Sequence, residues 1–383
     1  MTFFDDNVSN PPDQSSDPQL SASQSSEPQL SEITPPLPGD PLSYTISRPL
    51  LYSERPEVPE DLRISWSWVH LLCFIVFALG VFAILPFLMA IPYLQGKHIR
   101  PQELENYLYS IPQFVVGSTL ASFAAILFFL YITLAKINGK PFWHTLGWRK
   151  LSVVISKLPG NPWAYFFSGC ALSLITSIVG SRVHTPDDMP IELLMKSKVG
   201  ATLMMAMAVL VAPLVEETVF RGYLYPVLVR IVSAVVRFIA ADSARATRIS
   251  VLASIAIVAT LFRVFHKGRL AWTWGILSLL IFVSIILIVV RFIGTDYARA
   301  IRAGIFSSVV LTGGLFGVLH GAQLAWTWGI VSLLILVGII FTYVRARTGT
   351  VFASYLMHLG YNSLIAFVSI LATHGFTKMP PHP

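Results

Sequence analysis

Residues 201–228 read ATLMMAMAVLVAPLVEETVFRGYLYPVL, an apolar stretch long enough to cross a bilayer that carries three ionisable side chains. These are Glu216, Glu217 and Arg221. Ionisable groups at bilayer depth are costly, so they are rare in membrane spans and usually mark a functional site. The stretch therefore predicts a spanning helix and a site inside the membrane.

The composition of the whole chain also indicates a membrane protein. Of its 383 residues, 54% are hydrophobic and 12% are charged, whereas soluble domains carry about 25% charged residues. We predict an all-α, polytopic transmembrane helical bundle of about nine spans, near 66–94, 109–135, 162–181, 199–226, 249–265, 270–290, 304–321, 324–344 and 350–372. The piece 227–240 contains Arg230 and Arg237, and we interpret it as interfacial.

Four regions are predicted along the chain. Residues 1–60 are rich in Ser, Pro and Gln and repeat SSDPQL (15–20) as SSEPQL (25–30), a composition typical of a disordered tail. N-terminal transmembrane helices (61–198), a core (199–372) and a short C-terminal tail (373–383) follow. The N-terminus lacks an apolar core, so we expect no cleavable signal peptide.

Basic residues predict how the chain is oriented. The loop 136–161 contains five of them, so the positive-inside rule places it and the N-terminus in the cytoplasm. Loops 95–108 and 182–198 then face outward. Orientation explains the net charge of +7 better than a nucleic-acid partner. Cys73 and Cys170 lie in apolar runs and are expected to be free thiols.

The core contains a tandem duplication, with copies at about 234–287 and 288–341. AVVRFIAADSARATR (234–248) returns as IVVRFIGTDYARAIR (288–302), and LAWTWGILSLLI (270–281) returns as LAWTWGIVSLLI (324–335). Each copy holds two predicted spans, so the insertion preserves the orientation of every later helix.

The duplication produces two copies of one short motif, Phe262 to His266 and Phe316 to His320. The second copy is flanked by glycines that permit close helix approach, namely Gly313, Gly314, Gly317 and Gly321. The first is surrounded by Arg263, Lys267 and Arg269, which suit an interface better. We predict that His320 is functional and that His266 is a decoy copy.

Helical spacing predicts which of the polar side chains can pair with each other. Glu217 and Arg221 are four residues apart and can pair on one face, while Glu216 points about 100° away and is free to take a proton from water. Pro213 should kink this helix and leave a carbonyl unpaired.

His358 and Asn362 share one face of a later helix, where two donors could bind an oxyanion. Each feature has a structural alternative: an ion pair that joins helices, a polar contact between helices, or a lone histidine in a packed bundle.

Three motifs in order, EETVFR (216–221), FGVLH (316–320) and HLGYN (358–362), resemble the signature of the CPBP family of intramembrane proteases. That family includes type II CAAX prenyl endopeptidases and bacteriocin-processing or self-immunity proteins. The resemblance covers about 199–372 and implies a catalytic cavity within a helical bundle.

The resemblance also implies roles for the motif residues. Glu216 and His320 would activate water, and His358 and Asn362 would stabilise the oxyanion. Glu217 would take part directly or, with Arg221 and Phe316, support the site. The duplication departs from the family pattern, because it adds two spans between the first and second motifs.

The resemblance leaves the cofactor open. The family is usually described as metalloproteases, and Glu216, His320 and His358 are a ligand set that zinc accepts. The HExxH pattern is absent, however, and a metal-free mechanism is equally compatible with these side chains.

The expected function is hydrolysis of a membrane protein or peptide substrate within the lipid bilayer, in a bacterial inner membrane. Two alternatives remain: a catalytically inactive scaffold or immunity protein, and a transporter or proton relay, since buried Glu, His and Arg also mark ion pathways.

Overall fold

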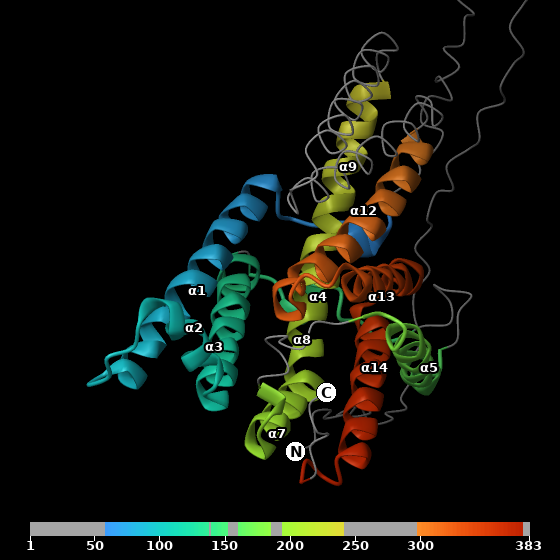
Figure 1. Ribbon diagram of the computed structural model, residues 1–383. Coiled ribbons are helices and arrows are strands. Elements are labelled where there is room, and N and C mark those ends of the chain that lie inside the picture. Colours follow the sequence, from blue (N-terminus) through green and yellow to red (C-terminus); the bar gives the residue numbers. More distant parts are fainter. Residues whose placement is uncertain (1–57, 138, 152–159, 185–193, 241–296, 378–383) are drawn as a thin grey trace, which may run out of the picture. The chain divides into compact units, whose positions relative to one another are not determined.

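The structure, a computed structural model, describes residues 58–137, 139–151, 160–184, 194–240 and 297–377 (Figure 1). Every regular element in these ranges is a helix, and seven helices are long and apolar enough to cross a membrane. The all-α membrane-bundle prediction is therefore confirmed. The N-terminal tail, the spans predicted at 249–265 and 270–290, and His266 lie outside the described residues.

The N-terminal part of the described chain begins with a 3-10 turn and contains the first three candidate spans. In order they are η2 (Glu60–Leu62), α1 (Trp68–Leu94), α2 (Pro101–Tyr109), α3 (Pro112–Leu130) with its π turn η3 (Tyr131–Lys136), α4 (Phe142–Thr145) and α5 (Pro162–Gly180). α1 packs on α3. α5 begins where the Asn161 side chain accepts a hydrogen bond from the Trp163 amide and Pro162 occupies the first turn.

The ionisable stretch forms one long helix interrupted by π turns. Its parts are α7 (Lys198–Ala206), η4 (Met207–Val211), α8 (Ala212–Glu216), η5 (Glu217–Leu224) and α9 (Tyr225–Ala240). The apolar span covers Lys198–Phe238 without a break. Residues 227–240, interpreted as interfacial, thus continue this helix, and their position relative to the bilayer stays a prediction. Four of the five valines of α9 are buried, the exception being Val235 at 47% exposure, and α9 packs along α12 (Figure 1).

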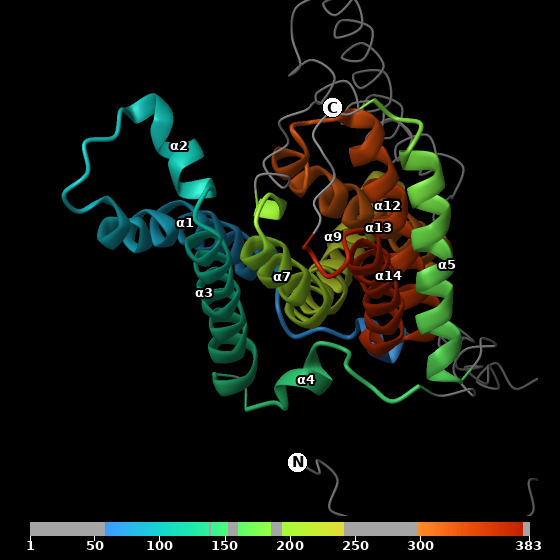
Figure 2. The ribbon, with the colours of Figure 1, turned by 60° about the horizontal axis from the view of Figure 1, so that its bottom comes forward.

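Three helices complete the core: α12 (Tyr297–Leu319), α13 (Trp328–Thr348) and α14 (Val351–Ala372), with a 3-10 turn η6 (Ala322–Leu324) after α12. α13 ends at Gly349 in the left-handed conformation, and Thr350 caps α14. α12 packs on α13, and α14 lies beside α5 (Figure 2).

Glycines allow these helix pairs to approach closely. A Cβ at Gly313 would lie 2.4 Å from the Ile339 nitrogen, and one at Gly360 would lie 2.0 Å from the Phe166 oxygen. Such contact is typical of helix pairs in membranes, where small residues bring backbones together.

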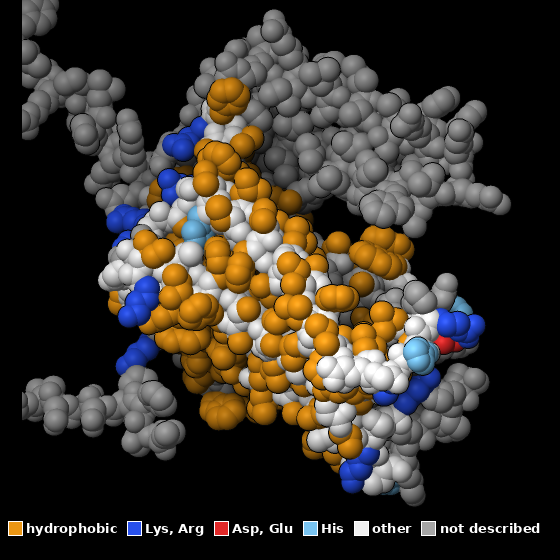
Figure 3. Space-filling model, turned by 90° about the vertical axis from the view of Figure 1, so that its left-hand side faces the viewer, with side chains coloured by type: hydrophobic (Ala, Val, Ile, Leu, Met, Phe, Trp, Pro, Cys, Tyr) orange, Lys and Arg blue, Asp and Glu red, His pale blue; other side chains and the backbone are white. Residues whose placement is uncertain are grey.

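The outer surface of the described helices is apolar. Hydrophobic side chains cover most of the face shown in Figure 3, and Lys and Arg lie at its margins. Large hydrophobic residues on α1 are among the most exposed, including Leu79 and Phe87. A surface of this kind suits lipid contact, in agreement with an integral membrane protein.

Candidate active site

Glu217 and Arg221 form an ion pair with no exposed surface. Arg221 Nη1 donates to Glu217 Oε1 at 3.0 Å, and both side chains are 0% exposed. The spacing of four residues predicted this pair. A buried charge needs a partner of opposite sign, so the two residues are required together.

Arg221 is also held by α13, which the sequence analysis did not implicate. Its Nε donates to Thr342 Oγ1 at 3.2 Å and its Nη2 to the Gly338 carbonyl at 3.0 Å. The guanidinium lies 4.5 Å from the ring centroid of Phe316 and 5.5 Å from that of Phe341. Phe316 therefore covers the cation, which explains an aromatic residue four positions before His320.

Glu216 faces two imidazoles rather than Arg221. Its Oε1 lies 3.9 Å from His320 Nε2, and its Oε2 lies 3.9 Å from His358 Nε2. Neither separation is a hydrogen bond. The Glu216 side chain keeps 16% of its surface exposed and His320 keeps 25%, whereas His358 keeps 5%. The first glutamate of the pair is thus the accessible one.

The hydrogen-bond partners define which ring nitrogens carry protons. His320 Nδ1 lies 2.6 Å from the Phe316 carbonyl oxygen, which can only accept, so Nδ1 is the donor. His358 Nδ1 donates in the same way to Glu217 Oε1 at 3.0 Å. Both Nε2 atoms are therefore directed at Glu216 while their rings are fixed from behind.

Asn362 fastens the interrupted turn that precedes Glu216. Pro213 has no amide hydrogen, and the helix widens into the π turn η4 just before it. Asn362 Nδ2 donates to the Ala208 carbonyl in this turn at 2.7 Å. The interruption expected from Pro213 is present, and Asn362 supplies a donor to one of its carbonyls.

The comparison with protein families agrees with this geometry. Residues 198–296 and 288–364 match the family model described as type II CAAX prenyl endopeptidase Rce1-like. This match supports membership of the core in the CPBP family. No curated protein and no solved structure matches the chain. Membership supports a protease at the general level.

The two matched parts of the CPBP core also bear on the duplication. The second part begins at 288, the position at which the second copy was predicted to start. It contains Phe316 and His320, together with His358 and Asn362.

Contacts join six of the predicted site residues into one cluster, whereas Asn362 lies one turn beyond His358 and bonds to Ala208. Glu216, Glu217 and Arg221 come from α8 and η5, Phe316 from α12, His320 from the turn after it, and His358 and Asn362 from α14. Sequence reasoning missed Gly338, Phe341 and Thr342. The four-residue spacing of Gly338 and Thr342 was a signal, but only packing shows that α13 faces Arg221.

A metal site was the open cofactor alternative for the CPBP core. Among the described residues, no group of three His, Cys, Asp or Glu side chains is arranged to hold a metal ion. The two separations of 3.9 Å between Glu216 and the imidazoles exceed the roughly 3.4 Å between tetrahedral zinc ligands. This geometry does not fit zinc, and whether a metal is required stays a prediction.

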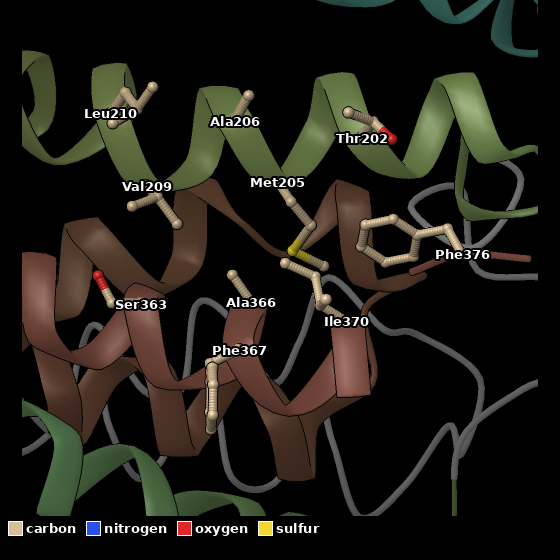
Figure 4. Close-up of a pocket in the computed structure, with 10 residues that line it drawn as sticks. All are labelled: Thr202, Met205, Ala206, Val209, Leu210, Ser363, Ala366, Phe367, Ile370 and Phe376. Atoms are coloured by element: carbon tan, nitrogen blue, oxygen red, sulfur yellow. The ribbon is translucent and has the colours of Figure 1, made fainter. Parts of the chain in front are cut away.

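An apolar groove opens beside the CPBP site, between α7 with its π turn and α14 (Figure 4). Its volume is about 420 Å³. Val209 and Ser363 line it, and they are the chain neighbours of Ala208 and Asn362. The groove thus lies between the same two helices that the Asn362–Ala208 hydrogen bond joins.

Proposed function

We propose that this protein is an intramembrane endopeptidase that hydrolyses membrane-associated protein or peptide substrates. The observation that carries the proposal is the Glu216 carboxylate, partly exposed and faced on its two oxygens by the imidazoles of His320 and His358. A carboxylate with two oriented imidazoles can accept, hold and return a proton.

The first step is activation of water by Glu216 with His320. A water between them would donate one hydrogen to the carboxylate, and the neutral Nε2 of His320 would accept the other. The oxygen would then attack the carbonyl carbon of the scissile peptide bond. The proton held at Glu216 would pass to the leaving amine as the carbon–nitrogen bond breaks.

The second requirement is stabilisation of the tetrahedral oxyanion. Glu216 and Glu217 are two anions and Arg221 is one cation, so an imidazolium at His358 would balance the cluster. Its Nε2 hydrogen could then donate to the oxyanion. Asn362 would contribute the amide hydrogen that does not bond to Ala208.

The buried pair supports this arrangement. Arg221 fixes Glu217, and Glu217 Oε1 in turn accepts from His358 Nδ1. A carboxylate behind a histidine fixes the ring orientation. We therefore assign supporting roles to Glu217, Arg221 and Phe316, and no step depends on a metal ion.

The substrate we propose is an apolar polypeptide segment held in the bilayer. The apolar groove beside Asn362 (Figure 4) favours such a substrate over a soluble one. The family description adds C-terminal CAAX peptides with a prenyl group as a specific class to test. We further propose a bacterial inner membrane, with the N-terminus in the cytoplasm.

A product-mapping experiment tests the function. Purified protein in liposomes would be incubated with transmembrane peptides and with prenylated and unprenylated CAAX peptides, and products would be identified by mass spectrometry. We expect discrete cleavage by the wild type that persists in chelator. Absence of any product from the folded protein would support the scaffold or transporter alternatives.

A further inference from the structure

One hydrogen bond joins the helix that carries Glu216 and Glu217, here called the catalytic helix, to a residue outside the three motifs. The indole Nε1 of Trp148 donates to Thr218 Oγ1 at 3.2 Å, and this hydroxyl donates to the Leu214 carbonyl at 2.6 Å. Thr218 is fully buried and directly follows Glu217. Since a hydroxyl both donates and accepts, the indole fixes its rotation beside the carboxylate.

The same tryptophan contacts the helix that carries His358. The Trp148 and Tyr355 ring centroids are 5.3 Å apart. Tyr355 precedes His358 by one turn of α14. Trp148 thus touches both helices whose separation determines the 3.0 Å contact between Glu217 and His358.

The connector that carries Trp148, residues 142–149, is itself anchored. The Val351 amide donates to the Gly147 carbonyl at 2.9 Å. Thr350 Oγ1 donates to the Arg149 carbonyl at 2.7 Å. These bonds fasten the connector to the start of α14, so Trp148 does not depend on a free loop for its position.

The connector also lies directly against the catalytic helix. A Cβ at Gly222 would come within 2.8 Å of the Leu146 carbonyl oxygen, and Leu146 is 1% exposed. Gly147 has φ +81° and lies on the Arg345 guanidinium, where a Cβ would be 2.9 Å from Nη2. This packing leaves Trp148 little freedom to move away from Thr218.

We infer that Trp148 is a positioning residue for the reaction, acting through Thr218 and Tyr355 to hold Glu217 against His358. The inference rests on the proposed protease function, because Glu217 and His358 are placed in its machinery. Trp148 touches neither water nor substrate in this account. Its removal should change the rate of the chemical step rather than substrate binding.

A double-mutant cycle tests the pathway through Thr218. We expect Trp148→Phe to lower kcat about tenfold and to leave KM within about twofold, since small misplacements of catalytic groups slow the chemistry. Thr218→Val should do the same. The double variant should be no slower than either single variant, because the two substitutions remove the same Trp148–Thr218 hydrogen bond. Trp163→Phe, at a tryptophan of α5 with 62% exposure whose ring packs on Phe166 and Phe167 of its own helix, is the matched control and should retain wild-type kinetics.

A second readout does not need turnover. The rate at which diethylpyrocarbonate modifies His358 reports whether the ring is still bonded to Glu217. Mass spectrometry would measure this rate, normalised to that of the exposed His98. We expect the modification to be at least about threefold faster in Trp148→Phe and unchanged in Trp163→Phe. Even if the wild type cleaved no peptide, this comparison would still test Trp148.

Three results would overturn the inference. One is an unchanged kcat together with unchanged His358 modification in Trp148→Phe. Another is additivity of the two single variants, which would mean that Trp148 acts independently of Thr218. The third is an effect confined to KM.

Discussion

Arg221 shows what a fully buried charge requires. Its guanidinium donates to a carboxylate, a hydroxyl and a carbonyl, and three aromatic rings surround it. Removing one member of such a cluster leaves the other charge without compensation in a medium of low dielectric constant. The pair therefore belongs to the architecture of the site as well as to its chemistry.

We predict that Arg221→Met destabilises the protein by about 3–5 kcal/mol, because Glu217 would stay buried without its cation. The double variant Glu217→Gln/Arg221→Met should recover part of that loss. Unfolding in detergent, followed by circular dichroism, measures both. A double variant no more stable than Arg221→Met would show that the lost charge pairing is not the cause.

The sequence predicted the residues of this cluster better than their surroundings. The spacings in 216–221, 316–320 and 358–362 are local, and a helix fixes them without reference to its neighbours. Gly338, Phe341 and Thr342 enter only through the contact of α13 with η5, which depends on three-dimensional packing. Asn362 was predicted as a donor, but its bond to Ala208 depends on the π turn.

At the scale of elements, glycines determine how closely α12 and α13 approach. Cβ atoms at Gly313 and Gly317 would come within 2.4 Å and 2.5 Å of α13, whereas a Cβ at Gly314 meets nothing within 4 Å. Phe316 lies on the same helix and covers Arg221. The interhelical distance is thus linked directly to the site.

We predict that Gly313→Ala and Gly317→Ala each destabilise the protein by about 1–3 kcal/mol, as overpacked helix contacts do. Gly314→Ala is the matched control and should be neutral within about 0.5 kcal/mol. Detergent unfolding would rank the three variants. Equal stability of all three would contradict the close packing of α12 and α13.

The interpretation of 227–240 also belongs to this scale. Two arginines on an apolar background favoured an interfacial piece, yet α9 continues the catalytic helix. Its valines at 227 and 236 are fully buried, and Gly304 of α12 lies directly against Ser233. Composition describes a segment's own preference for the interface, whereas the partner helix decides where it lies.

At the scale of the molecule, the segment before α1 is tied into the bundle. Asp61 accepts from Arg345 at 2.8 Å, and Arg345 is 1% exposed. The Trp66 ring stacks on Tyr223 at 5.7 Å, and its carbonyl accepts from Arg230. These contacts fix residues 60–66 against the elements that surround the site.

We predict that Asp61→Asn lowers stability by about 3 kcal/mol, because it leaves the buried Arg345 without its anion. Glu103→Gln breaks the exposed pair with Arg100 and should change stability by less than about 1 kcal/mol. Detergent unfolding of both variants provides the comparison. Equal effects would contradict the conclusion that the buried Arg345 depends on Asp61 for its charge.

Orientation of the whole chain is a separate prediction. In a variant with Cys73 and Cys170 replaced by Ser, Lys140→Cys should react with an impermeant maleimide only after the membrane is opened. His98→Cys should react in intact cells. The reverse pattern would invert the proposed topology.

The sequence predicted the class of the molecule because hydropathy and length decide whether a helix crosses a bilayer. It could not show how Glu216 and His320 meet. The two residues belong to separate predicted spans, 199–226 and 304–321, and only the packing of the Lys198–Phe238 helix with α12 brings them to 3.9 Å.

The most direct test of the central claim is single-turnover cleavage in proteoliposomes by the wild type and by Glu216→Gln, which keeps the shape of the side chain and removes the base. We predict at least a thousandfold loss of rate, with folding and substrate binding unchanged. Cleavage by folded Glu216→Gln at the wild-type rate would contradict the assignment of Glu216 as the residue that activates water.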